Sequence, residues 1–204
     1  MKQLPALGPT RKLTLPKQAE RTLHNGLTVI AIRRASVPLV EIRLRLPFAK
    51  AHLARTSLLT QTLFSGTPTL STVDIAAELQ KVGGALGAAA DPDRLLITGN
   101  ALVTGLARQL EILADVVMNA EYPASEVATE RDRLVDRIQV AQSQPAHLAR
   151  VALLKRMYGT HPYAVQTPGA DAVRAVKPAA LRELHAQRLH PAGATLVIVG
   201  DLAP

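Results

Sequence analysis

The chain has 204 residues, of which 48% are hydrophobic and 20% charged, a balance typical of globular proteins with an aliphatic core. Cysteine is absent, which excludes disulfide bonds, thiolate metal sites and a cysteine nucleophile. The net charge of +8 comes from dispersed lysines and arginines, and aromatic residues make up only 2%. Because nucleic-acid-binding surfaces usually combine a basic patch with stacking aromatics, we predict no nucleic-acid partner.

The beginning of the chain carries neither a targeting signal nor a regular pattern. No basic start followed by an apolar stretch is present, and no run of about 18 apolar residues occurs anywhere in the sequence. We therefore expect a cytoplasmic protein without a membrane partner. Residues 1–19 contain prolines and lysines without periodicity, so they are expected to form an extended arm that precedes a single domain over residues 20–204.

Three strands are predicted first in this domain. Residues 21–33 have β-forming residues on both sides of Asn25-Gly26, and Asn-Gly between such residues is a strong hairpin signal. Residues 40–46 alternate between apolar and charged side chains, which is typical of a strand with one buried face.

Helices and strands then alternate up to residue 118. Gly66 and Gly83-Gly84 follow stretches with helical spacing and predict where two helices end, and Ser71 or Thr72 is suited to cap the second helix. Asp91-Pro92-Asp93 predicts a turn between two strands. In chain order, we expect helices over 53–65 and 73–82, strands over 85–90 and 95–102, and an amphipathic helix over 106–118.

The remainder is predicted to be helical until a final strand. Ser125 is expected to cap a long helix that ends before Pro145, and Pro178 suits the first turn of another. The predicted elements are helices over 125–142, 147–158 and 178–189, an irregular segment over 161–163 and an apolar strand over 194–199. A hairpin, inserted helices and a returning strand indicate an α+β fold with helices packed on one face of a mostly antiparallel sheet.

Six short motifs carry a resemblance to a known family. In order along the chain they are Leu23-His-Asn-Gly-Leu-Thr-Val29, Leu63-Phe-Ser-Gly-Thr67, Val82-Gly-Gly84, Glu130-Arg131, Tyr158-Gly-Thr-His-Pro-Tyr163 and Val197-Ile-Val-Gly-Asp201. The sequence thereby resembles the N-terminal domain of the insulinase/pitrilysin-type (inverzincin) metallopeptidases, which include the mitochondrial processing peptidase and the core subunits of the bc1 complex. The resemblance implies a LuxS/processing-peptidase-like metallohydrolase fold. It also implies that residues 20–204 are the N-terminal half of a longer two-domain architecture.

The resemblance further implies where a zinc site would lie. Active relatives carry His-x-x-Glu-His on a helix, with two zinc-binding histidines and a glutamate as general base, and a later glutamate as third ligand. Alignment on residues 63–67 puts Ser57 and Gln61 at the histidine positions and Thr60 at the base, and alignment on Glu130 puts Arg137 at the third ligand. Because a guanidinium cannot coordinate zinc, we expect no zinc and no other cofactor here, and no catalytic residue.

Relocated metal ligands would need histidines elsewhere. The six histidines form neither His-x-x-Glu-His nor its inverse, and none is paired at a spacing of four. We expect surface or capping roles for them; His185 and His190 flank a helix end, and His161 belongs to a structural motif.

Arg137 leads to a more specific prediction. Glu130, Arg133 and Arg137 share one face of the long predicted helix. We predict that the Arg137 guanidinium lies near the place of the missing cation and pairs with Glu130; the alternative is that both side chains are solvated.

The resemblance also implies a peptide-binding edge. Active relatives hold an extended substrate on a strand that starts near Gly-Gly-x-x-Asn-Ala, and Gly87 stands at the Asn position here. Backbone pairing needs no particular side chain, so the strand over Gly87, Ala88, Ala89 and Ala90 is a candidate for weak peptide binding.

These observations favour an inactive member of the family. The leading interpretation is the non-catalytic subunit of a two-chain peptidase, whose partner is a homologous active chain and which helps to enclose a peptide chamber. A free-standing scaffold or peptide-binding protein is the alternative, and a metalloendopeptidase with relocated ligands is the third.

Overall fold

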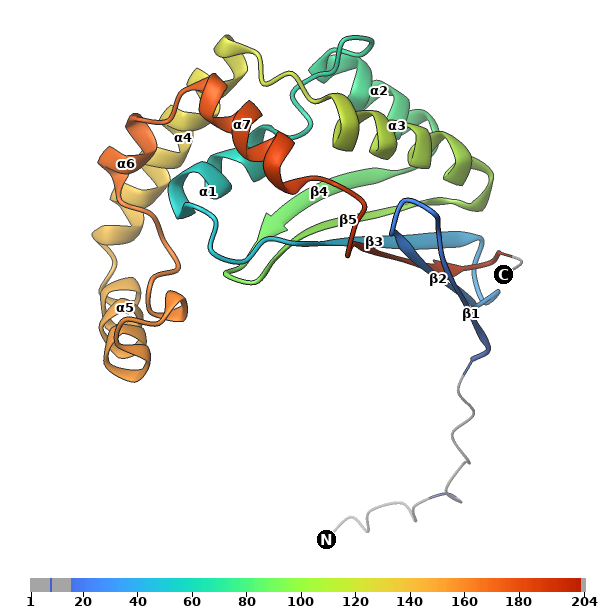
Figure 1. Cartoon of the computed structure of the whole chain (residues 1–204), viewed down its shortest axis with the longest axis horizontal. Coiled ribbons are helices and arrows are strands. Elements are labelled where there is room, and N and C mark those ends of the chain that lie inside the picture. Colours follow the sequence, from blue (N-terminus) through green and yellow to red (C-terminus); the bar gives the residue numbers. More distant parts are fainter. Residues whose placement is uncertain (1–7, 9–15, 203–204) are drawn as a thin grey trace, which may run out of the picture.

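The computed structural model describes residue 8 and residues 16–202, which are built around one six-stranded sheet (Figure 1). The strands are β1 (Gln18–Thr22), β2 (Thr28–Arg33), β3 (Leu39–Pro47), β4 (Ala85–Ala90), β5 (Arg94–Leu102) and β6 (Thr195–Gly200). Their order across the sheet is β1-β2-β6-β3-β5-β4. Among these described pairs, β2 and β6 run parallel and the others antiparallel, so the mostly antiparallel sheet is confirmed.

Most of the α-helices in the described part cover one face of the sheet. They are α1 (Leu53–Thr62), α2 (Thr72–Lys81), α3 (Leu106–Asn119), α4 (Ala124–Gln142), α5 (Pro145–Tyr158), α6 (Ala170–Arg174) and α7 (Pro178–Arg188). Figure 1 shows α1, α2, α3, α4 and α7 together above the strands, which confirms the α+β prediction. Within the described residues, no helix combines the length and apolarity that crossing a bilayer requires.

The core lies between this helical layer and the sheet. Side chains along β3 alternate strictly between buried and exposed, as its sequence pattern predicts, because one face of the strand meets the helices. The buried residues of β3 are Val40, Ile42, Leu44 and Leu46. Helix α1 contributes Leu58 and Leu59 to the same core, and Leu63 follows at its end; none of the three has exposed surface. The core is therefore mainly aliphatic, and it holds α1 between the sheet and the neighbouring helices.

The predicted start of α2 is confirmed in atomic detail. The Ser71 side chain accepts a hydrogen bond from the backbone N–H of Asp74 at 3.2 Å, and the Asp74 carboxylate accepts one from the backbone N–H of Ser71 at 3.0 Å. This capping box satisfies two N–H groups that the first turn leaves unpaired. The Ser71 hydroxyl also donates to the Asp74 carboxylate at 2.6 Å. This bond and the one from the Ser71 N–H lower the pKa of Asp74, so the carboxylate is ionised at neutral pH.

Several predicted boundaries differ from the structure. Strand β1 begins at Gln18, inside the predicted arm, whose residues 1–7 and 9–15 lie outside the described part. Helix α4 begins at Ala124 after Pro123, so Ser125 is not its cap. Pro145 is the first residue of α5, because a proline needs no N–H partner in the first turn. Helix α6 was not predicted.

The Val197–Asp201 motif contains a glycine that the sheet requires. Gly200 pairs with Val40 of β3 and Arg33 of β2. A Cβ atom at this position would lie 2.7 Å from Val40 Cα and would overlap the Leu39 carbonyl oxygen. The close approach of three strands at the end of β6 therefore leaves room only for hydrogen here.

His185 has a buried role, and the expected surface or capping role is wrong for this histidine. It is 8% exposed; its Nε2 lies 2.9 Å from the Val117 carbonyl oxygen and its Nδ1 lies 2.7 Å from the Tyr122 hydroxyl. Because a carbonyl only accepts, Nε2 donates to Val117. Burial lowers the pKa of His185 and keeps the imidazole neutral, so Nδ1 accepts from Tyr122. The ring joins α7 to the end of α3 and to the segment that follows it.

We expect this pair to make stability depend on pH. Burial lowers the pKa of His185, and the bond to Val117 opposes only part of that shift. The unfolded chain therefore takes up a proton below about pH 6.5, before the folded chain does, so the free energy of unfolding falls as pH falls, by at most about 1.4 kcal/mol per pH unit. Urea unfolding at pH 7.5 and 5.5 measures this decrease. In His185→Gln, which cannot titrate, the decrease should be smaller; an equal decrease would assign the effect to other groups.

Candidate functional site

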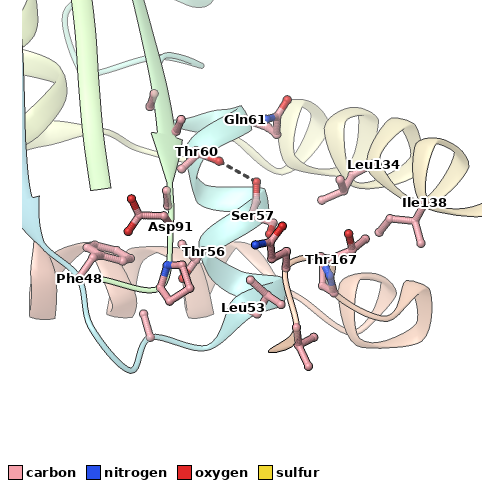
Figure 2. A pocket seen from close by; sticks show the side chains of 18 residues that line it. Phe48, Leu53, Thr56, Ser57, Thr60, Gln61, Asp91, Leu134, Ile138 and Thr167 are labelled. Atoms are coloured by element: carbon pink, nitrogen blue, oxygen red, sulfur yellow. Dashed lines mark hydrogen bonds between the residues drawn. The ribbon is translucent and has the colours of Figure 1, made fainter. Parts of the chain in front are cut away.

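A cavity of about 570 Å³ opens beside α1, at one end of β4 (Figure 2). It lies between α1, the middle of α4, the turn that joins β4 to β5, and the segment before α6. Its lining is mostly neutral. The lining residues are Phe48, Ala51, Leu53, Thr56, Ser57, Thr60, Gln61, Ala88, Ala89, Ala90, Asp91, Pro92, Leu134, Ile138, Val165, Gln166, Thr167 and Pro168.

Helix α1 brings its predicted site residues to this cavity. Ser57, Thr60 and Gln61 are three and four residues apart, so they share a helix face, and all three line the cavity (Figure 2). The Thr60 hydroxyl donates to the Ser57 carbonyl oxygen at 3.0 Å. Deeper along the same helix, the Thr56 hydroxyl is buried and has no hydrogen-bond partner in the described structure. The cavity therefore offers a ligand hydroxyl and amide groups.

Arg137 reaches the same helix from α4. Its guanidinium donates a hydrogen bond to the Gln61 side-chain oxygen at 3.1 Å, although 76 residues separate the two in sequence. The positions aligned with a histidine ligand and with the third ligand are therefore in contact. Both side chains are exposed, so the contact lies at the mouth of the cavity.

The predicted ion pair between Arg137 and Glu130 is wrong, because Glu130 pairs with another arginine. Glu130 instead accepts from Arg133 at 2.6 Å. Seven residues correspond to about 10.5 Å along a helix axis, whereas three correspond to about 4.5 Å, so the nearer arginine takes the carboxylate. Arg137 is then left to contact Gln61.

Asp91 supplies the charge on the cavity lining. Partial burial acts to raise its pKa, but the backbone N–H groups of Asp93 and Arg94 and the guanidinium of Arg94 outweigh this effect and lower the pKa below its ordinary value. Asp91 is therefore an anion at neutral pH, held within its own turn by Arg94 at 2.9 Å.

Strand β4 is an edge of the sheet, since it pairs with β5 alone in the strand order. Ala88, Ala89 and Ala90 line the cavity, whereas Gly87 lies in a separate shallow depression with Glu41 and Thr98. The buried Gln109 side chain fixes the start of β4, because its Nε2 donates to the carbonyl oxygens of Ala85 at 3.0 Å and Asn100 at 2.8 Å.

Sequence reasoning missed the wall formed by residues 165–168. Its position follows from a tertiary contact, the hydrogen bond from the Tyr163 hydroxyl to the Asp93 carboxylate, which ties the segment after α5 to the turn between β4 and β5. His161 helps to shape this segment, since its Nδ1 accepts from the backbone N–H of Tyr163 at 3.3 Å. The structural role expected of His161 is therefore present, but nothing in its sequence motif indicates the cavity.

The residues at this site do not fit a zinc ion. Two hydroxyls, an amide and a guanidinium occupy the four aligned positions, and zinc prefers imidazole, thiolate or carboxylate ligands. Across residue 8 and residues 16–202, no three His, Asp or Glu side chains gather closely enough to hold a metal ion.

Comparison with family profiles shows the family of this sequence. The profile described as Insulinase (Peptidase family M16) matches residues 55–171, more than half of the chain. This chain belongs to the insulinase family. The match begins on α1 and extends through α4, so it includes both helices that meet at the cavity.

Relatives of known name agree with this assignment. An uncharacterized zinc protease of Mycobacterium tuberculosis is 30% identical over 69% of the chain and 32% of its own length. The potato (Solanum tuberosum) mitochondrial-processing peptidase subunit alpha is 31% identical over 62% of the chain and 26% of its own length. The chain thus spans about a third or less of these insulinase-family relatives.

Solved structures agree on the fold. A peptidase M16 inactive domain from Pseudomonas fluorescens superposes with a TM-score of 0.83 over 92% of this chain and 47% of that chain, at 24% identity. The similarity is to about half of that insulinase-family chain, and it concerns the fold alone.

Proposed function

We propose that this chain is a non-catalytic subunit that pairs with an active zinc peptidase of the insulinase family and forms part of the wall around its peptide. The observation that carries the proposal is the contact between Gln61 and Arg137. The positions that would bring two metal ligands together in an active relative are in contact here, and they carry an amide and a cation. The helices that would support the site remain, while the groups needed for zinc chemistry are absent from the aligned positions.

The potato relative supports the pairing. Its name describes it as a subunit, so a subunit role occurs among relatives of this chain. The edge strand β4 beside a neutral cavity supports contact with a peptide, because an extended peptide can add to an unpaired strand edge through backbone hydrogen bonds.

Co-expression tests this proposal directly. The chain is produced with a family member from the same genome that carries His-x-x-Glu-His, and the two are separated by size-exclusion chromatography. We expect one-to-one co-elution, no zinc-dependent peptidase activity from this chain alone, and activity of the pair at least about tenfold above that of the active chain alone, or about 1.4 kcal/mol in the barrier. Glu→Gln in the partner's motif should abolish the activity. Zinc-dependent hydrolysis by this chain alone would contradict the proposal.

A free-standing peptide-binding protein is a second candidate, favoured by the same strand edge and cavity. It predicts that the isolated chain binds extended peptides and does not associate with the active homologue. Fluorescence anisotropy with a labelled unstructured peptide, run beside the co-elution experiment, separates the two functions.

A further inference from the structure

Helix α5 is apolar around its whole circumference, yet none of its residues is buried. Leu148 is 52% exposed and Met157 is 63% exposed. They are nine residues apart, and at about 100° per residue they lie on opposite sides of the helix. Leu153, between them, is 57% exposed. A helix that is hydrophobic on all sides is normally found inside a protein, so the exposure of α5 needs an explanation.

The position of α5 accounts for this exposure. Figure 1 shows the helix beyond the end of the sheet, apart from the layer formed by the other helices. Helix α5 contacts α4 and the segment that follows α5 in the chain. Its Arg150 donates a hydrogen bond to Gln166 of that segment at 2.8 Å. His147 and Leu154 are half-buried against this segment. Arg150, Val151 and Lys155 line the same depression, and the other side chains of α5 are exposed.

The charged residues in the sequence around α5 are all basic. Residues 137–170 contain no aspartate or glutamate, but they contain Arg137, Arg150, Lys155 and Arg156. Apolar side chains outside α5 add to the surface, since Val140 is 60% exposed and Val165 is 59% exposed. The structure thus presents an exposed apolar helix in a stretch of chain whose charged residues are all cations.

The arrangement of these side chains indicates which kind of partner would bind α5. A flat membrane surface would cover one side of a helix, but the exposed apolar residues of α5 point to opposite sides and its cations are not gathered on one face. A second copy of this chain packed through the same helix would bring like charges together. A groove that encloses the helix, with an apolar floor and carboxylates along its rim, satisfies both features.

We propose that α5 inserts into an apolar groove rimmed by aspartate and glutamate side chains on a different protein chain. Leu148, Leu153 and Met157 supply the buried contacts of this interface, and Lys155 and Arg156 pair with the rim. Leu148, Leu153 and Met157 do not line the cavity and lie outside β4, so the proposal goes beyond the proposed function and does not depend on it.

Photo-crosslinking in the cells that express the protein tests this interface. The full chain carries p-benzoyl-L-phenylalanine in place of Leu153, or in place of Val73, which is 75% exposed on α2 and serves as the matched position. We expect a crosslink from position 153 and not from position 73. Mass spectrometry should map it to a peptide of another protein that combines apolar and acidic residues.

Charge reversal supplies the second readout. K155E/R156E should reduce the crosslink yield at position 153 at least about tenfold, because like charges would face each other across the rim. R33E/R34E reverses another exposed adjacent pair, at the end of β2, and should leave the yield unchanged. Circular dichroism confirms that each variant folds. Absence of a crosslink, a crosslink to lipid or to a second copy of this chain, or equal sensitivity to both reversals would overturn the proposal.

Discussion

The variant S57H/T60E/Q61H/R137E is expected to bind one zinc ion per chain, at least about 100-fold more tightly than the parent chain, since imidazole and carboxylate ligands replace groups that zinc does not prefer. Positions 57 and 61 are one helical turn apart and line the same cavity. In the parent, a guanidinium nitrogen of Arg137 lies 3.1 Å from the side-chain oxygen of Gln61. Two histidines and a glutamate would therefore converge, with a glutamate at position 60 beside them.

Chelator competition and metal analysis measure this binding. The triple variant S57H/T60E/Q61H is the matched control, because it keeps the Arg137 guanidinium beside the new site. We expect its zinc affinity to be at least about tenfold lower than that of the quadruple variant, since it lacks a carboxylate ligand and retains a cation that repels the metal. If the folded quadruple variant binds zinc no better than the parent, the alignment of these four positions is wrong.

The elements of this fold could be predicted from sequence because their signals are local. Alternation along residues 40–46, the Asn25-Gly26 turn, the capping residue Ser71 and the glycines after α1 and α2 each act within a few residues. Such signals give the type of each element and most of its bounds. They do not give the order of strands, because the insertion of β6 between β2 and β3 depends on pairing across 150 residues or more.

The site was predictable in part, through its spacing on α1. Ser57, Thr60 and Gln61 had to share a face of any helix over this segment. The partner of Arg137 could not be derived from helix geometry alone, since its contact with Gln61 depends on how α1 packs against α4.

The role of His185 shows the same limit. Its buried contacts with Tyr122 and Val117 join residues more than 60 positions apart, and a lone histidine near a helix end carries no local signal of them. The wall at residues 165–168 depends likewise on the contact between Tyr163 and Asp93. Apart from the short helix α6 and several element boundaries, what sequence reasoning missed was therefore tertiary contact.

Leu59→Ala is expected to destabilise the fold by about 2–5 kcal/mol, because it removes most of a fully buried side chain at the centre of the core and leaves a cavity. Helix α1 packs against β4, α4 and α7, so the loss acts on the element that positions Ser57, Thr60 and Gln61. Urea or thermal unfolding followed by circular dichroism measures the change. The variant should also lose any peptide binding that depends on α1.

Leu153→Ala is the matched control, since it is the same substitution on a helix where the leucine is 57% exposed. In the isolated chain we expect a change within about 0.5 kcal/mol, as for other substitutions of surface residues. The contrast separates the two leucines by function: one stabilises the chain itself, while the other is available to a partner. If Leu153→Ala destabilised the isolated chain as much as Leu59→Ala, α5 would belong to the folding core and its apolar surface would need no partner.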